Sequence, residues 1–170
     1  TDASGNYLFN NLRPADYSIE VVLPASGFIF SPRDQGSNTT DSDVDTTTGR
    51  TINTTLSPSE NDLTWDAGLI PLGSIGDTVW VNLDGDAVVA PGETGISGVT
   101  VNLLNSGGTV IGTTTTNASG SYSFTNMPPG DYAIQVVLPP VYIFSPQDSA
   151  SGTDATDSDA NTSTGRMINT

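Results

Sequence analysis

One loop of the sequence, NLDGDAVVAPGE at residues 82–93, carries oxygen-bearing side chains at the spacing that proteins use to bind calcium. Positions 1, 3, 5 and 12 of such a loop are occupied here by Asn82, Asp84, Asp86 and Glu93. Alternate residues place side-chain oxygens around one turn, and a final glutamate closes the shell with two more oxygens. A backbone carbonyl near Val88 supplies a further ligand. The loop therefore predicts a Ca²⁺ site.

The same loop departs from the usual calcium pattern at two positions. Asn82 stands where an aspartate is usual, which removes one negative charge. The sixth position, where the pattern has glycine, is occupied by Ala87, and the glycine falls at Gly85 instead. These differences weaken the expected affinity more than the expected geometry. The alternative interpretation is an acidic surface hairpin that holds no ion.

A second set of acidic residues occurs twice in the chain. The Asp-Ser-Asp segment at 157–159 repeats the same three residues at 41–43. Carboxylates at this density repel one another unless a cation lies among them. Asp148 and Asp154 lie near the second copy in sequence, and Asp77 could join either site. The alternative is a solvated loop. The candidate calcium ligands from the two copies are Asp41, Asp43, Asp157 and Asp159.

The charge balance excludes several classes of function. The net charge is −15, from 19 acidic residues and four basic ones, and the chain has no His and no Cys. All four basic residues are arginines. A chain this acidic repels nucleic acid and anionic membrane surfaces. Without His, Cys or Lys, the usual nucleophile–base pairs and Schiff-base chemistry are absent, so we expect no enzyme. No apolar run reaches the roughly 18 residues of a membrane span.

The chain is an internal repeat that starts and stops out of frame. Residues 1–23 recur at 116–138, and residues 41–54 recur at 157–170, which gives a unit of about 115 residues. We expect 1–70 to be the C-terminal part of one repeat and 71–73 a short linker. Residues 74–170 are then the next repeat without its last strand, so both parts expose open sheet edges.

Within each unit the pattern predicts an all-β fold. Apolar and polar residues alternate with period two over 75–81, 99–104 and 131–138, and turn residues interrupt the chain every 8–12 residues. Such alternation predicts short half-buried strands, and their number and spacing favour an antiparallel β-sandwich. No segment shows a sustained helical period. Apolar strands are also expected at 28–32 and 142–146.

Aromatic residues of the two copies are expected in the core rather than in a sugar-binding platform. They alternate along the predicted strands, so their rings lie on one face of the sheet. The residues concerned are Tyr122, Phe124 and Tyr132, with Tyr7, Phe9 and Tyr17 as their counterparts.

Several segments together resemble the B-type domains of Gram-positive surface adhesins, in particular the serine-aspartate-repeat (Sdr) protein B domain, a relative of the collagen-adhesin (Cna) B domain. The similarity rests on IGDTVW at 75–80, the acidic loop 82–93, GISGVTVNLL at 95–104, and the Gly-x-Tyr-x-Phe…Gly-Asp-Tyr-x-Ile stretch at 120–134. The resemblance implies tandem transthyretin-like or Ig-like sandwiches of about seven strands. It also implies that the Asp-Ser-Asp segments supply further calcium ligands. The absence of Lys excludes the Lys–Asn isopeptide bond found in many collagen-adhesin B domains.

These observations favour a structural role outside the cell. We expect a repeat of a cell-surface stalk, filament or surface layer, stiffened by calcium, whose partners are neighbouring repeats in a homo-polymer or filament. The alternative is an adhesin module that binds a host protein or glycan directly. The two copies differ mainly at 24–40 against 139–156, by small polar changes and no new Trp, which favours the spacer. Glycans are further partners if the Asn-x-Ser/Thr sites at Asn38, Asn53, Asn117 and Asn161 are used.

Overall fold

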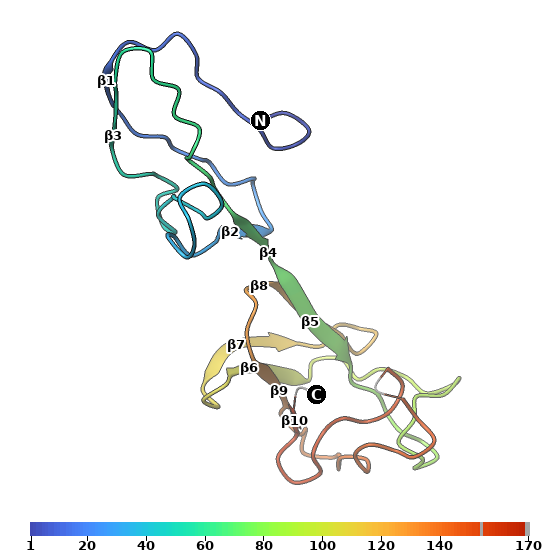
Figure 1. Cartoon of the computed structure of the whole chain (residues 1–170). Helices are drawn as coiled ribbons and strands as arrows, with labels where there is room; N and C mark the ends of the chain where they lie inside the picture. The colour runs from blue at the N-terminus through green and yellow to red at the C-terminus, as the bar shows by residue number, and fades with distance from the viewer. Residues whose placement is uncertain (154, 169–170) are drawn as a thin grey trace. The chain divides into compact units, whose positions relative to one another are not determined.

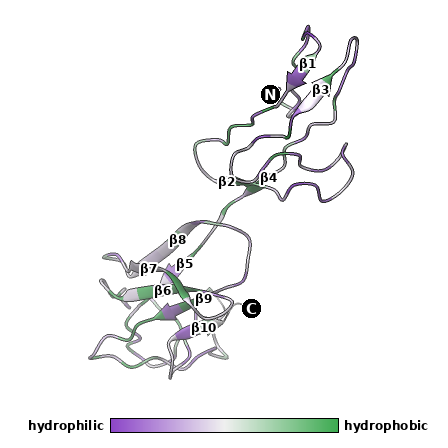
Figure 2. Cartoon of the chain, turned by 90° about the vertical axis from the view of Figure 1, so that its left-hand side faces the viewer, coloured by the Kyte–Doolittle hydropathy of each residue, from purple (hydrophilic) through white to green (hydrophobic). Residues whose placement is uncertain are grey.

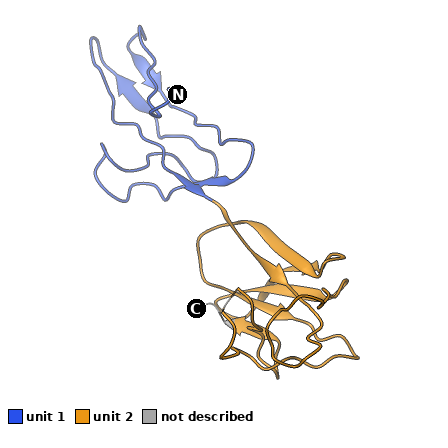
Figure 3. Ribbon diagram, turned by 90° about the vertical axis from the view of Figure 1, so that its right-hand side faces the viewer, with its two compact units in different colours: residues 1–71 blue, residues 72–170 orange. Residues whose placement is uncertain are grey.

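The computed structural model describes residues 1–153 and 155–168 (Figure 1). The described residues form strands, turns and loops and contain no helix, which confirms the all-β prediction. Accordingly, no helix in this part of the chain is long and apolar enough to cross a bilayer. The chain divides into two compact units, residues 1–71 and 72–170 (Figure 3).

Unit 2, residues 72–170, is an antiparallel β-sandwich. One sheet pairs β5 (Gly73–Thr78) with β8 (Ser121–Met127). The other has the order β10-β9-β6-β7, formed by β6 (Thr100–Asn105), β7 (Val110–Thr115), β9 (Tyr132–Val136) and β10 (Arg166–Ile168). The β6–β7 hairpin forms at the Ser106-Gly107-Gly108 turn, where Gly108 has a positive φ of 79°. β5, β6 and β9 lie in the three segments in which the sequence showed period-two alternation, although β5 ends at Thr78 and β9 at Val136.

The core of unit 2 lies between the two sheets. Val101 and Leu103 of β6 and Ile134 and Val136 of β9 point to the same side, because alternate residues of a strand share a face. Tyr122 of β8 packs against them from the opposite sheet. The hydropathy of these strands can be followed in Figure 2. The aromatic assignment is therefore confirmed for Tyr122, which is buried, and partly for its half-buried neighbours.

Unit 1, residues 1–71, has less regular structure. Two short antiparallel pairs join β1 (Ala15–Tyr17) to β3 (Thr54–Leu56), and β2 (Phe28–Phe30) to β4 (Leu69–Pro71). The buried apolar side chains of this unit are those of Phe30 and Val44.

The prediction that Tyr7 and Phe9 belong to a core is wrong for this chain. Both side chains are exposed, Phe9 by 63%, and residues 6–10 form no strand. The counterpart segment in unit 2 is β8, which is held by pairing with β5. Unit 1 contains no segment equivalent to β5, so the same residue pattern has no sheet to join and no second layer to pack against.

The prediction of an apolar strand is confirmed at 28–32 and wrong at 142–146. The first segment forms β2 because β4 pairs with it, whereas the second forms no strand although its sequence is nearly the same. Among the described residues of unit 2, no strand pairs with 142–146 as β4 pairs with β2. The predicted linker 71–73 joins β4 to β5 directly, since Pro71 ends the first and Gly73 begins the second.

Leu103→Ala should destabilise unit 2 by about 2–5 kcal/mol, because the side chain is 3% exposed and its removal leaves a cavity between the sheets. Val110→Ala on the neighbouring strand β7 is the control, since Val110 is 48% exposed and should change stability by less than about 0.5 kcal/mol. Denaturant unfolding of the two variants measures the difference. Equal losses of stability in the two variants would show that Leu103 is not part of the core.

Candidate metal centre

The loop 82–93 is shaped by its own acidic and amide side chains. The Asn82 Oδ1 atom accepts a hydrogen bond from the backbone N–H of Gly85 at 2.8 Å, and Asp86 Oδ1 accepts one from Val88 at 2.8 Å. Asp84 Oδ1 accepts a longer bond, 3.2 Å, from Asp86. Each side chain thus accepts a hydrogen bond from a backbone N–H two or three residues later, and the backbone bends to allow it. Asn and Asp favour this kind of local turn.

Ala87 adopts the backbone conformation that calcium loops usually give to glycine. Its φ is +66°, in the left-handed region, although its side chain has a Cβ and is buried. This conformation costs a non-glycine residue roughly 1–2 kcal/mol. The backbone therefore still turns at the sixth position of the loop, although alanine replaces glycine there. The substitution raises the free energy of the turn without changing the path of the backbone.

Glu93 closes the loop through the backbone. Its Oε1 accepts from the N–H of Leu83 at 2.7 Å, and its Oε2 accepts from the N–H of Ala90 at 3.0 Å. Both oxygens that the sequence assigned to an ion thus hold backbone donors in this structure. The Glu93 carboxylate therefore joins the start and the end of the loop.

The structure brings the two predicted acidic clusters of unit 2 together. Val88 forms a β-bridge with Asp157, and Ser158 donates its N–H to the carbonyl of Ala87 at 3.0 Å. Val89 in turn donates to the carbonyl of Thr156 at 2.7 Å. Residues about 70 positions apart in sequence therefore lie side by side, which no local pattern in the sequence could reveal.

Equivalent carboxylate oxygens in the two units are buried without a hydrogen-bond partner. They are Oδ1 of Asp157 and Oδ1 of Asp41, and Ser42 Oγ in unit 1 is in the same condition. An unpaired buried carboxylate oxygen costs several kcal/mol unless a donor or cation satisfies it. The two residues occupy the same place in the repeat, so the feature is a property of the repeat.

Asp43, the second predicted acid of unit 1, is 3% exposed. Its Oδ2 accepts from the backbone N–H of Asp66 at 2.7 Å. Burial raises the pKa of Asp43, and the carboxylates of Asp41, Asp66 and Asp34 raise it further, while the Asp66 N–H opposes the shift. Asp66 was missed by sequence reasoning, because its segment occurs only once in the chain and no repeat marks it.

The remaining candidates are less tightly gathered. Burial, with smaller effects from the carboxylates of Asp77 and Asp159, raises the pKa of Tyr122 to about 12. Asp154 lies outside the described residues. Within the described residues, no three His, Cys, Asp or Glu side chains are placed to hold a metal ion together. A cation here would need amide, backbone or water oxygens as well.

The Asn-x-Ser/Thr sites all lie at exposed residues. Three of the four asparagines already form side-chain hydrogen bonds, and Asn38 donates its Nδ2 to the Thr64 hydroxyl at 3.2 Å. Asn117 Oδ1 accepts from the N–H groups of Ser119 and Ser121, and Asn161 Oδ1 accepts from those of Ser163 and Thr164.

A β-sandwich unit that follows a unit of repeated sequence, with acidic residues gathered in loops, defines a tandem-repeat β protein. The chain belongs to the SdrD B-like domain family, which matches residues 1–69 and 73–170. This membership confirms the resemblance seen in the sequence. It also places the chain among extracellular cell-surface proteins that are structural and have no enzymatic activity.

Three relatives illustrate the similarity. Serine-aspartate repeat-containing protein F of Staphylococcus epidermidis is 38% identical over 157 residues, covering 89% of this chain and 9% of that protein. Serine-aspartate repeat-containing protein D of Staphylococcus aureus (strain Newman) is 35% identical over 167 residues, covering 97% and 12%. Colossin-A of Dictyostelium discoideum is 37% identical over 140 residues, covering 82% and 1%. The chain thus spans a small part of each relative.

Asp43→Asn should stabilise the chain at neutral pH in EDTA. A carboxyl whose folded pKa is raised contributes its full stability below its ordinary pKa of 3.8, and this contribution is lost as the pH rises through the folded value. The amide cannot ionise, and it keeps an oxygen for the Asp66 N–H. The melting temperatures of variant and parent should therefore coincide at low pH and separate above about pH 4. Asp131→Asn, at an exposed residue, is the control. A pH-independent difference would contradict the assignment.

Proposed function

We propose that this chain is a calcium-stiffened structural repeat of an extracellular cell-surface stalk, filament or surface layer. The observation that carries the proposal is the pair of buried, unpartnered carboxylate oxygens at Asp41 and Asp157. The chain has only four Arg to set against 19 acidic residues, and its net charge is −15. A divalent cation from the surroundings would supply the positive charge that these two oxygens lack.

The donor set fits a hard cation. Calcium takes six to eight oxygen ligands with flexible geometry, and all candidates here offer oxygen. The ion, when bound, supplies the positive charge that the acidic loops lack. The residues that would hold it are, in unit 1, Asp41 and Asp43 and, in unit 2, Asn82, Asp84, Asp86, the Val88 carbonyl, Glu93, Asp157 and Asp159.

Comparison of the two units supports a site built from three segments in a complete repeat. In unit 2 the Asp-Ser-Asp segment is bonded to the loop 82–93. In unit 1 the same segment is bonded on the backbone to Asp66, since Asp43 donates its N–H to the Asp66 carbonyl at 2.8 Å. A repeat with both neighbours would carry acids on all three segments, and their repulsion would be relieved by one or more cations.

This arrangement explains why calcium would stiffen the repeat. The loop, the Asp-Ser-Asp segment and the last strand come from the beginning, middle and end of the repeat. An ion shared among them would cross-link segments that are otherwise joined by a few backbone hydrogen bonds. Without the ion, like charges would push these segments apart.

Removal of calcium should lower the melting temperature of the chain. For a site with a dissociation constant of about 10 μM in about 1 mM calcium, linkage gives roughly 2.7 kcal/mol of stabilisation. Asp157→Asn and Asp86→Asn should each reduce this calcium-dependent shift, because they remove charge and keep an oxygen acceptor. Asp131→Asn should leave the shift unchanged.

Differential scanning calorimetry in EDTA and in calcium measures the effect. Identical melting curves in the two buffers would contradict the proposal that the chain binds calcium. A calcium shift that survives both loop variants would assign the ion to a different set of residues.

A stalk of complete repeats should be extended and should respond to calcium. A strand of about ten residues spans about 33 Å, so each repeat should add on the order of 40 Å to a rod. Small-angle scattering from a protein of three complete repeats, with and without calcium, measures its maximum dimension. A short maximum dimension, or one indifferent to calcium, would favour the adhesin module that binds a host protein or glycan.

A further inference from the structure

One arginine of unit 2 lacks the carboxylate that holds its counterpart in unit 1. Arg50 of unit 1 forms a β-bridge with Glu20, and its Nε and Nη2 atoms donate to Glu20 Oε2 at 2.8 Å and 2.6 Å. The corresponding residues of unit 2 are Arg166 and Gln135, which lie opposite each other in β10 and β9. Glutamine in place of glutamate keeps the backbone pairing and removes the charge that neutralises the guanidinium.

No other group replaces that carboxylate in the part of unit 2 that the structure describes. The Arg166 side chain forms no ion pair or hydrogen bond there, and its Nε atom is buried without a partner. A buried donor without an acceptor is costly, and more so when it belongs to a charged group. The difference between the two units comes from residue 135, because the two strands that carry the pair are both formed in unit 2.

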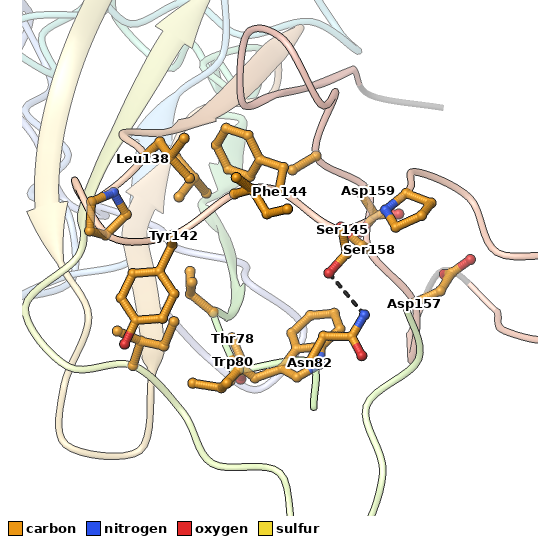
Figure 4. Close-up of a pocket in the computed structure, with 18 of the residues that line it drawn as sticks. Thr78, Trp80, Asn82, Leu138, Tyr142, Phe144, Ser145, Asp157, Ser158 and Asp159 are labelled. Carbon is orange, nitrogen blue, oxygen red and sulfur yellow. Dashed lines mark hydrogen bonds between the residues drawn. The ribbon is translucent and has the colours of Figure 1, made fainter. Parts of the chain in front are cut away.

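The acidic residues that precede Arg166 in the chain lie on the other side of its sheet. Met167 of β10 packs toward the core, so its neighbour Arg166 faces away from the core. A cavity of about 380 Å³ lies on the core side, where Met167, Asp157 and Asp159 are among the residues that line it (Figure 4). The guanidinium therefore stands on a face that these two carboxylates do not share.

The Arg166 side chain extends across that face toward the turn between β6 and β7. A Cβ atom on Gly108 of the turn would lie 3.6 Å from Arg166 Nη1 and 3.9 Å from Nη2. Leu104 of β6 is on this side of the sheet, since Leu103 takes the core side, and yet it is only 4% exposed. The aliphatic part of an arginine often covers apolar surface in this way, which fixes the position of the guanidinium.

A row of polar side chains crosses the same face from β7 to β9. Thr113 Oγ1 donates to Asn102 Oδ1 at 2.9 Å, and Asn102 Nδ2 donates to Gln135 Oε1 at 3.3 Å. Gln135 Nε2 in turn donates to the Thr164 carbonyl at 3.4 Å. A side-chain amide has two N–H groups, and each amide of the row uses one of them here. The row therefore keeps hydrogen-bond donors for a ligand beside Arg166.

We propose that this face of unit 2 binds a sugar acid, with Arg166 as the contact for its carboxylate and the polar row as the contact for its hydroxyl groups. Nε is the guanidinium nitrogen that is covered, so the carboxylate meets Nη1 and Nη2. Charge-assisted hydrogen bonds of this kind are the stronger ones, and the guanidinium gives them to Glu20 in unit 1.

The charge of the chain decides which carboxylate fits. A net charge of −15 repels a ligand with many negative charges, so the carboxylate must belong to a molecule that is otherwise neutral. Hydroxyl groups both donate and accept hydrogen bonds, which suits the amides of Asn102 and Gln135. A sugar acid combines one carboxylate with several hydroxyls. This site does not depend on calcium and is compatible with the structural role proposed above.

Titration of the full 170-residue chain with sodium glucuronate, followed by heteronuclear NMR in EDTA, tests the site. The amide signals of Arg166, Gln135 and Gly108 should shift and saturate at millimolar ligand. Glucuronamide, the same sugar with a neutral amide, should bind at least about tenfold more weakly, because the ionic contact is lost. Sodium acetate supplies the charge without the hydroxyls and should also bind more weakly.

Three variants separate the site from the fold. Gln135→Glu should weaken glucuronate binding by about tenfold or more, because it gives Arg166 the partner that Arg50 has in unit 1. Its melting temperature should be no lower than that of the parent, so the loss cannot come from unfolding. Arg166→Gln should weaken binding equally. Arg13→Gln, at an exposed arginine of unit 1, is the control and should leave binding unchanged.

Four results would overturn the proposal or part of it. The site is wrong if glucuronate shifts no signal of this face, or if binding survives Arg166→Gln. Equal binding of acetate would overturn the assignment to a sugar, and equal binding of glucuronamide would overturn the role of the carboxylate. Because the titration is done in EDTA, none of these results bears on whether the chain binds calcium, which calorimetry decides separately.

Discussion

The pairing of β6 with β9 is the interaction on which the structure of unit 2 depends. β6 is bonded on both sides, by β7 and by β9, and its Val101 is the most deeply buried side chain of the core. β9 in turn carries β10, and the long loop 137–165 returns from β9 to β10. The Asp-Ser-Asp segment lies within that loop. Its position beside the loop 82–93 therefore depends on the sheet built on β6 and β9, two strands that contain no charged residue.

Backbone amides, rather than basic side chains, satisfy many of the acids. The described residues contain two ion pairs, Arg33 with Asp34 and Arg50 with Glu20, all at exposed side chains. By contrast, the N–H groups of Thr48 and Thr47 and the Thr48 hydroxyl hold the pKa of Asp45 below its usual value. The counterpart of Asp45 is Asn161, which makes the same three hydrogen bonds to the turn that follows it. These turns require an acceptor and no charge, unlike the buried carboxylates of Asp41 and Asp157.

The sequence was sufficient to predict a segment's structure where the local residue pattern determines it. It was insufficient where the structure depends on pairing with a segment far away in the sequence. The alternation at 99–104 predicted β6, and the repeat predicted that Asp41 and Asp157 are equivalent. Phe9 and Phe124 share a local pattern, yet only the segment of Phe124 has a strand to pair with. Glu93 fits the calcium pattern by its position, but its contacts with Leu83 and Ala90 depend on how the loop folds. The meeting of Val88 with Asp157 is a long-range contact that periodicity does not encode.

The direct passage from β4 to β5 has a mechanical consequence. Only Leu72 separates the two strands, so tension applied along the chain reaches both ladders through one residue. β5 opposes that force with six residue pairs to β8, whereas β4 opposes it with three pairs to β2. Under load the last strand of a repeat yields before the first strand of the next. A pulled array would therefore lengthen in steps, each beginning with the release of a terminal strand, while the sandwich core behind it stays folded.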